Sequence, residues 1–108
     1  MSSSQMLKGI LEGCLLGIIE KGETYGYEMI EKLESYGFQM ISEGSIYPVL
    51  MRMQKEGFVQ SVLKASPSGP KRKYYTLTAL GQKEYEEFKL RWNELSHSVN
   101  RLVEEEIE

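Results

Sequence analysis

The sequence has few of the residues on which enzymes and metalloproteins depend. Its 108 residues include no Asp, one Cys (Cys14) and one His (His97). These two side chains cannot supply the three or four ligands of a zinc site, and a lone Cys cannot form an internal disulfide. Acid–base or nucleophilic chemistry would have to use Glu, Tyr or Lys alone. We therefore expect a protein without a metal, a cofactor or catalytic activity.

Long hydrophobic runs are also missing. Apolar stretches such as Cys14–Leu16 and Ile18–Ile19 are short, whereas a membrane span needs about 20 apolar residues. We expect neither a transmembrane helix nor a secretory signal peptide. Hydrophobic residues make up 41% and charged residues 27% of the chain, a composition typical of a soluble protein with a core of moderate size.

Basic residues are concentrated in the middle of the chain, although the net charge is −3. Residues 1–41 contain three Lys against six Glu, and residues 79–108 contain four basic against eight acidic residues. Residues 42–78 contain six basic residues against two Glu, a balance of +4. Nucleic-acid binding depends on a local basic patch and not on the total charge. The basic residues of this segment are Arg52, Lys55, Lys64, Lys71, Arg72 and Lys73.

Two amphipathic helices are predicted ahead of the basic segment, because apolar residues recur there at spacings of three and four. The first carries its apolar stripe from Leu7 to Ile19 and stops at Gly22. Cys14 lies within this stripe, so we interpret it as a small buried hydrophobe and not as a reactive thiol. The second helix covers residues 25–36 and ends at Gly37, a good helix-terminating residue.

A third helix follows, with an apolar stripe from Ile46 to Met53 and an end at residues 55–57. Its start is open. Ser42 can cap it, but Pro48 then lies inside the helix and cannot donate a hydrogen bond to the carbonyl of Gly44. A start at Ser45 avoids that conflict.

Two short segments rich in β-branched and aromatic residues, 58–63 and 73–77, predict a β-hairpin. The connection between them, residues 64–72, contains two prolines and Gly69. We expect these residues to block regular strand pairing and to leave an exposed loop with basic residues at both ends. A loop of this kind is called a wing.

The last predicted helix is capped by Thr78 and runs from Ala79 to about Glu105. At ~1.5 Å per residue it would be about 40 Å long, so it must overhang a domain with a radius of gyration of only ~13 Å. Its apolar seam needs a cover, for which the simplest candidate is the same helix of a second copy. In the competing interpretation the seam folds back onto its own core. The expected dimer contacts are Leu7, Leu11, Phe88, Trp92, Leu95, Val99 and Leu102.

The order of three helices, a hairpin with a basic loop and a long helix is that of a winged helix-turn-helix. The predicted fold is mainly α with a small β-hairpin. We expect a DNA-binding domain in residues 1–78 and a dimerisation helix in residues 79–108. The basic segment coincides with the two elements that would touch DNA, where phosphate neutralisation supplies affinity.

Several motifs also connect the chain to a known family. They are Thr24-Tyr25-Gly26-Tyr27-Glu28, Ser42-Glu43-Gly44-Ser45-Ile46-Tyr47-Pro48-Val49-Leu50, Lys55-Glu56-Gly57, Arg72-Lys73-Tyr74-Tyr75-Thr76-Leu77-Thr78 and the following Gly81. In this combination the chain resembles the PadR-type transcriptional regulators over almost its whole length. It looks like the short subgroup, in which a single C-terminal helix makes the dimer interface. The resemblance implies a bacterial, cytoplasmic repressor that binds double-stranded DNA at an inverted repeat.

The resemblance places the groove-facing helix at residues 42–56 and the wing at residues 64–73. Independently, Arg52 is the only fork-shaped donor on that helix, and the hydroxyls of Ser45 and Tyr47 suit phosphates or base edges. Tyr47 could equally pack against the second helix, and that alternative stays open. The candidate DNA-contacting residues are Thr24, Tyr25, Ser42, Ser45, Tyr47, Pro48, Arg52, Lys55, Lys64, Lys71, Arg72 and Lys73.

Trp92 has two interpretations. Multidrug-binding members of the family that resemble this chain use a Trp at this helix position, from both subunits, to sandwich flat aromatic compounds. A Trp in a dimer seam is otherwise an interface anchor. The resemblance thus points to a small aromatic effector as one partner, with Trp92 as its contact.

Three hypotheses for function follow. The leading one is a homodimeric DNA-binding repressor. The second is a winged-helix dimer that acts only as a protein interaction module and binds an acidic surface through its wing. The third is a protein that sequesters a small molecule at Trp92. All three predict a homodimer, so oligomeric state alone does not separate them.

Overall fold

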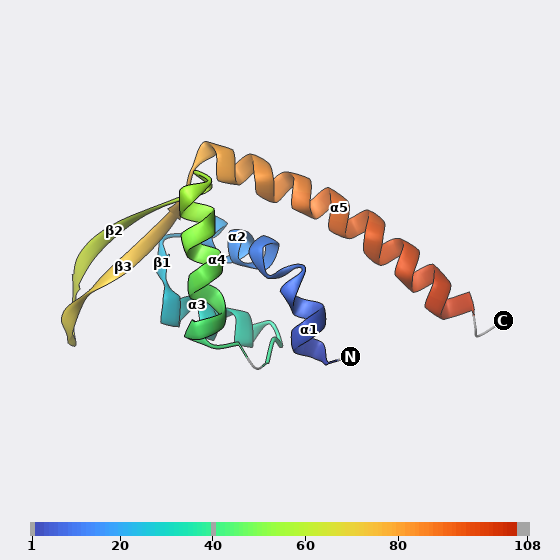
Figure 1. Ribbon diagram of the computed structural model, residues 1–108, viewed down its shortest axis with the longest axis horizontal. Helices are drawn as coiled ribbons and strands as arrows, with labels where there is room; N and C mark the ends of the chain where they lie inside the picture. Colours follow the sequence, from blue (N-terminus) through green and yellow to red (C-terminus); the bar gives the residue numbers. More distant parts are fainter. Residues whose placement is uncertain (1, 40, 106–108) are drawn as a thin grey trace.

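The computed structural model describes residues 2–39 and 41–105 and shows a small helical body from which a hairpin and a long helix project (Figure 1). The molecule measures 58 × 28 × 20 Å. No helix in the described part of the chain has the length and hydrophobicity needed to cross a membrane. The elements are α1 (Ser3–Lys8), α2 (Leu11–Glu20), β1 (Thr24–Tyr25), α3 (Gly26–Ser35), α4 (Glu43–Lys55), β2 (Val59–Ser66), β3 (Gly69–Leu77) and α5 (Ala79–Glu104).

The core forms where α2, α3 and α4 meet the sheet. Helix α2 lies at the centre and contacts α3, α4, α5 and β3, which explains why most of its residues are buried. Cys14 is half-buried on this helix, and burial raises the pKa of its thiol. The largest fully buried side chains are Tyr75, Leu15, Leu16, Ile19, Met29, Leu33, Ile46, Leu50, Met53 and Thr24.

The N-terminal segment forms two helices where one continuous stripe had predicted a single helix. Helix α1 ends at its C-cap Gly9, and Ile10 leaves helical geometry with φ −118° and ψ 0°. The Ile10 N–H donates to the Leu7 carbonyl at 2.9 Å, which tightens the chain at the break. Gly9 lowers helix propensity here. The apolar spacing continues across the break, so periodicity alone did not reveal it.

Helix α4 begins at Ser42, the earlier of the two possible starts. The Ser42 hydroxyl accepts a hydrogen bond from the Ser45 backbone N–H, and the Ser45 hydroxyl accepts one from the Ser42 N–H. Pro48 therefore lies inside the helix and has no N–H to donate to the carbonyl of Gly44. The reciprocal cap compensates by holding two backbone donors at the start of the helix.

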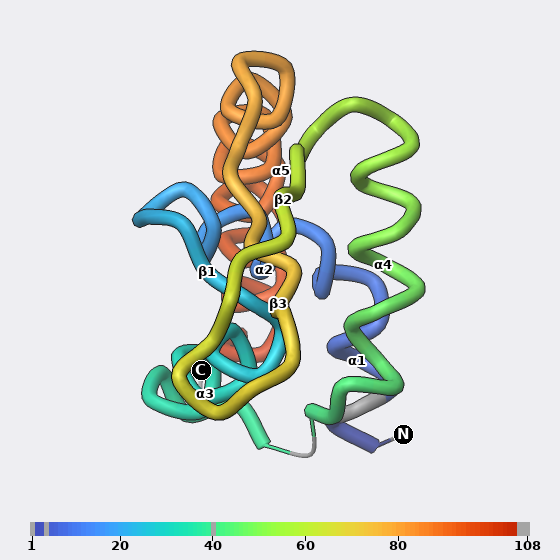
Figure 2. The backbone as a smooth tube through the Cα atoms, turned by 90° about the vertical axis from the view of Figure 1, so that its left-hand side faces the viewer, coloured from blue at the N-terminus to red at the C-terminus, as the bar shows by residue number. Residues whose placement is uncertain are grey.

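The wing is a paired hairpin, so the prediction of an irregular loop at residues 64–72 was wrong. Lys64 pairs with Arg72, and Ser66 pairs with Gly69. Between these pairs, one residue of β2 (Ala65) lies opposite two residues of β3 (Pro70 and Lys71), and this bulge accommodates Pro70. The turn itself takes only Pro67 and Ser68. Figure 2 shows the hairpin beside α4, and Figure 1 shows its tip extending away from the body.

A third strand was missed in the sequence. Thr24 and Tyr25 form β1, which pairs antiparallel with Tyr75 and Tyr74 of β3 and makes the sheet order β1-β3-β2. Two residues are too few to show an alternating pattern. By pairing with β3, this strand connects the start of α3 to the base of the wing.

Helix α5 has the predicted cap and length. The Thr78 hydroxyl accepts from the Gly81 N–H at 2.9 Å and donates to the Gly57 carbonyl at 2.6 Å. The first turns pack on α2, where a Cβ on Gly13 would lie 2.2 Å from the Phe88 ring.

The C-terminal part of α5 leaves the body (Figure 1). Trp92, Leu95, Val99 and Leu102 are exposed in the single chain, so the seam does not fold back entirely onto its own core. Residues 106–108 of the expected C-terminal unit lie outside the described residues.

Candidate nucleic-acid interface

Helix α4 presents one row of residues directly away from the core. Ile46, Leu50 and Met53 are buried on its inner side. The opposite side carries what we call the outer ridge, the residues at positions i, i+4, i+7 and i+11 of one helix face. The outer ridge consists of Gly44, Pro48, Met51 and Lys55, all of which are exposed.

The wing supplies cations on the same side of the molecule. Lys71 and Lys73 are exposed, and within the described residues neither has a carboxylate within 4.0 Å. Lys64 is paired with Glu23, which neutralises part of its charge. The Arg72 guanidinium lies 4.4 Å from the centre of the Tyr25 ring and donates to the Ser68 hydroxyl. Tyr25 thereby holds Arg72 in place by a cation–π contact.

A cleft of about 460 Å³ joins the wing to the start of α3 and α4. Tyr47 forms part of its wall and is 43% exposed. Its hydroxyl lies 3.4 Å from where a Cβ on Gly26 would be, so Tyr47 both packs against α3 and faces the cleft. The lining residues include Tyr25, Tyr47, Lys71, Arg72 and Lys73, which the sequence had proposed as DNA contacts.

Thr24 lies beneath this surface, which corrects its expected place among the contacting side chains. It is fully buried, and its hydroxyl donates to the Glu28 carboxylate at 2.7 Å. This hydrogen bond is the main cause of the lowered pKa of Glu28. Thr24 therefore supports the N-terminus of α3 and has no surface for DNA.

Arg52 is turned toward α2. Its Nη2 lies 3.7 Å from Oε2 of Glu12. On the wing side of α4 the polar residue is instead Gln54, which accepts a hydrogen bond from Ser61 of β2. Arg52 therefore lies beside the outer ridge and is held away from the wing.

Glu12 is the residue of this site that sequence reasoning missed. Burial raises the pKa of its carboxyl above the usual range, and the Arg52 guanidinium opposes that shift only in part. Oε1 of Glu12 is buried, and it has no hydrogen-bond partner among the described residues. A Glu in the first turn of an amphipathic helix is a common surface residue, so the sequence contained no signal for this contact.

The caps of α4 account for the two serines among the predicted contacts. Ser42 and Ser45 are exposed, but the Ser45 hydroxyl also donates to the Ser42 carbonyl at 2.7 Å. Their side chains are thus already hydrogen-bonded within the cap. Lys55 lies at the far end of the outer ridge, in the last turn of the helix.

A second surface lies between α1 and α5. A hollow of about 980 Å³ is lined by Met6, Leu7, Phe38, Trp92 and Leu95, among others. Leu7 is half-buried there. Leu11, in contrast, is only 6% exposed within its own chain and has almost no surface left for a partner. A smaller hollow of about 280 Å³ between α2 and α5 is lined by Glu12 and Trp92, among others.

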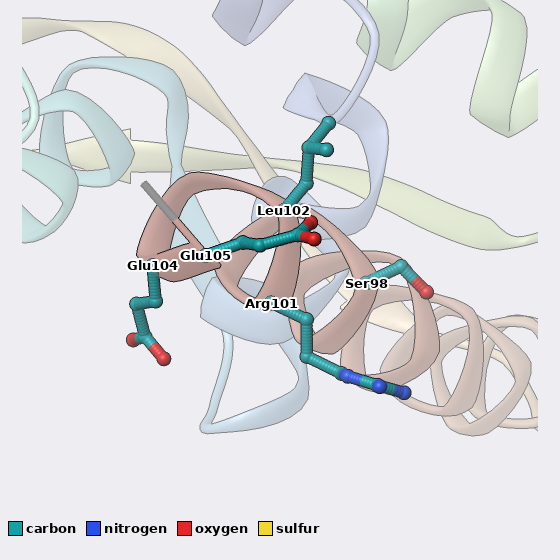
Figure 3. A pocket seen from close by; sticks show the side chains of 5 residues that line it. All are labelled: Ser98, Arg101, Leu102, Glu104 and Glu105. Atoms are coloured by element: carbon teal, nitrogen blue, oxygen red, sulfur yellow. The ribbon is translucent and has the colours of Figure 1, made fainter. Parts of the chain in front are cut away.

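The end of α5 is a further hollow of about 580 Å³. Figure 3 shows that its side chains, among them Arg101, Leu102 and Glu105, come from one helix and point apart. Such a hollow has no opposite wall in the single chain. It does not assemble a converging set of polar groups, and it continues the exposed face of α5.

Together, the outer ridge of α4, the paired wing and its exposed cations define a winged helix-turn-helix protein of the DNA-binding class. Comparison with known proteins extends this assignment. The model of the transcriptional regulator PadR-like family matches residues 15–87. The chain belongs to this family, whose members are transcriptional regulators that bind DNA and not enzymes.

Solved structures support the assignment along most of the chain. A PadR-like transcriptional regulator from Bacillus cereus strain ATCC 14579 is 56% identical, with a TM-score of 0.82 over 92% of this chain and 96% of that chain. A PadR family transcription regulator from Clostridium difficile R20291 is 28% identical, with a TM-score of 0.77 over 87% of this chain and 98% of that chain. Like these proteins, the present chain is short and ends in a single long helix.

A curated relative is longer. The negative transcriptional regulator PadR of Bacillus subtilis (strain 168) is 29% identical over 92 residues, which cover 83% of this chain and 50% of the relative. The present chain thus spans half the length of that protein.

The raised pKa of Glu12 predicts how stability depends on pH. A carboxyl whose pKa is raised by folding binds its proton more tightly in the folded state, so stability falls as the pH rises through that pKa. Glu12→Gln, which cannot ionise, should therefore gain free energy of unfolding relative to the wild type between about pH 4 and pH 7. Urea unfolding at a fixed protein concentration measures the difference.

Glu28→Gln is the matched control, because the pKa of Glu28 is lowered. Its contribution to stability is lost as the pH falls from its usual pKa of 4.5 toward the lowered pKa, so the wild type should gain relative to the variant as the pH rises to about 4.5 and should change little from there to pH 7. Equal trends for the two variants would contradict the assignment of Glu12 as a desolvated carboxylate.

Proposed function

We propose that this protein is a homodimeric repressor that binds an inverted repeat in double-stranded DNA. Each protomer places the outer ridge of α4 in the major groove and the wing along the phosphates. The observation that carries this proposal is that Tyr47 of α4 and the exposed Lys71 and Lys73 of the wing line one cleft, beside the exposed outer ridge. The name of the Bacillus subtilis relative, a negative regulator, supports repression. Such a regulator acts in the bacterial cytoplasm, where the chromosome lies.

The proposal divides the chain into a DNA-binding unit, residues 1–78, and a dimerisation helix, residues 79–108. Phosphate contacts would come from Lys55, Lys64, Lys71, Arg72 and Lys73. Release of condensed counterions from each neutralised phosphate supplies sequence-independent affinity and makes binding depend on salt. Base contacts would come from the exposed part of α4, with Tyr47 and Pro48 at its wing side.

DNA binding should therefore weaken steeply with salt. With about three to four phosphates neutralised per protomer, the slope of log K against log salt should be roughly −5 to −7. Lys73→Glu should reduce affinity for every duplex and make the slope less steep by about two units, one for each protomer of the dimer. Fluorescence anisotropy on a duplex selected from a random pool measures both quantities.

Lys83→Glu is the matched control, because it makes the same charge change at an exposed position on α5. It should leave the slope close to the wild-type value. If the wild type shows no salt dependence on any duplex, the protein does not read DNA through these elements. An interaction module with an acidic protein partner would then explain the cationic wing.

The dimer is proposed from the exposed apolar face of α5. Trp92, Leu95, Val99 and Leu102 repeat at heptad spacing along a helix that overhangs its own body. Full burial of each large apolar side chain is worth about 1.5–3 kcal/mol. A second copy related by a two-fold axis covers the same face on both protomers. Leu7 lines the hollow beside α1, which adjoins this face, and Phe88 lines the smaller hollow beside Trp92. Leu11 is buried in its own chain and is left out of the proposed contact.

Leu95→Glu should convert the dimer to monomers, because it places a charge in the middle of the seam. Leu90→Glu makes the same change on the opposite side of α5 and should leave the dimer intact. The two leucines are 57% and 67% exposed in the single chain, so neither change disturbs the core. Sedimentation at micromolar concentration measures the oligomeric state of each variant. The same oligomeric state for both variants would reject this interface.

Trp92 is proposed as the contact of a flat aromatic effector. It lines both the hollow beside α1 and the smaller hollow beside Glu12 and is 45% exposed in the single chain, so a ring can stack on its face. Titration with a planar aromatic dye should quench Trp92 fluorescence in the wild type and weaken DNA binding. Quenching that leaves DNA affinity unchanged would favour a sequestering protein over a regulated repressor.

A further inference from the structure

The outer ridge of α4 has almost no hydrogen-bonding chemistry at its centre. Gly44 has no side chain, Pro48 has no polar atom in its side chain, and Met51 has only a thioether, which is a weak acceptor. Lys55 lies at the end of the row. A helix face that only meets solvent usually carries charged or amide side chains.

The polar residues of α4 that flank the ridge are engaged elsewhere. Arg52 is held by Glu12 of α2. Gln54 accepts a hydrogen bond from Ser61 at the base of the wing. The residues that could form bidentate hydrogen bonds with a base are therefore turned to the sides, and the most prominent side chain at the centre is apolar.

Met51 is that side chain. It is 68% exposed, it lies one helical turn from Pro48, and it lies on the face opposite the buried Ile46 and Met53. The cleft with Tyr47 and the cationic residues opens on the adjacent side. If α4 enters the major groove in the proposed way, Met51 is carried deepest into it.

The major groove offers one prominent apolar group, the C5 methyl of thymine. Adenine, guanine and cytosine present only hydrogen-bond donors and acceptors there. We propose that Met51, supported by Pro48, is the residue that determines specificity and that it recognises thymine by contact with this methyl group. This inference rests on the proposed DNA-binding function and adds the chemistry by which α4 selects its site.

The size of the effect follows from the area that the contact removes from water. Burial of one methyl or methylene group is worth about 0.8 kcal/mol, which corresponds to a roughly fourfold change in affinity. Loss of the methyl from one thymine in each half-site of a dimer should therefore weaken binding by up to about sixteenfold.

The test replaces each thymine of the selected duplex with deoxyuridine, one position at a time. This change removes only the methyl group and keeps base pairing and charge. We expect about a fourfold loss of affinity at one or two positions in each half-site and no loss at the others. At a sensitive position, cytosine should bind weakly and 5-methylcytosine should recover part of the affinity, which separates the methyl group from the other features of thymine.

Two variants connect the effect to Met51. Met51→Leu keeps an apolar side chain and should still prefer thymine to deoxyuridine at the sensitive positions. Met51→Gln keeps the length of the side chain but makes it polar, so it should bind both duplexes with equal affinity. Both changes are at an exposed position, and unchanged thermal unfolding will show that each variant is folded. Leu90→Gln on α5 is the control and should keep the wild-type preference.

The outcomes are distinct. A wild type that binds its selected duplex with the expected salt dependence but tolerates deoxyuridine at every position would overturn the methyl contact and leave the proposed function standing. A thymine preference that survives in Met51→Gln would overturn the role of Met51. Failure to bind any duplex would reject the proposed function, and the inference with it.

Discussion

The close approach of α5 to α2 is the contact on which the arrangement of the molecule depends. At Gly13 and Gly17 a side chain would meet the rings of Phe88 and Tyr85, and at Gly81 it would meet the carbonyl of Phe58. These glycines let aromatic side chains lie directly on backbone. The contact sets the angle at which α5 leaves the body. In a dimer built on α5, that angle also sets the distance between the two reading helices.

Helix α2 is a shared support because it contacts α4 as well as α5. Glu12 illustrates the connection. Its carboxylate pairs with Arg52 of α4 and also lines the smaller hollow beside Trp92. If the protein is the dimeric repressor proposed above, a group bound in this hollow would change the solvation of the carboxylate beside Arg52. A change at the dimer face would then alter α4 through a single intervening element, α2.

Much of this architecture could be predicted from the sequence. The features that could not be predicted are those that the spacing of apolar residues does not record. Helices α3, α4 and α5 follow from apolar spacing and from caps such as Thr78, which are local signals. The length of the wing did not follow, because Pro70 blocks pairing unless a bulge absorbs it. The break at Gly9 and the strand at residues 24–25 were hidden for similar reasons. The apolar spacing of α1 and α2 continues across the break between them, so it does not reveal the break. A strand of two residues is too short to show the alternation by which strands are predicted.

The candidate site divides in the same way. The cations of the wing were visible as a charge cluster, and the structure places Lys71, Arg72 and Lys73 on one cleft. The burial of Thr24 and the pairing of Arg52 with Glu12 result from tertiary packing between residues that are distant in sequence. The sequence singled out Arg52 because it is the only fork-shaped donor on α4. The structure corrects the expected orientation of its guanidinium, which lies 3.7 Å from Glu12 of α2, and its contact with DNA stays a prediction.

This correction changes how affinity and specificity are distributed over the surface. Phosphate contacts attract any duplex, so the exposed cations of the wing and Lys55 cannot choose a sequence. With Arg52 held by Glu12, the centre of α4 has little capacity for hydrogen bonds to bases. Selection must then come from shape, from Tyr47 at the edge of the cleft and from apolar contact. A reading helix built around Gly44, Pro48 and Met51 is suited to fit closely into the groove, because small and apolar residues permit close approach and leave no polar group of their side chains unpaired.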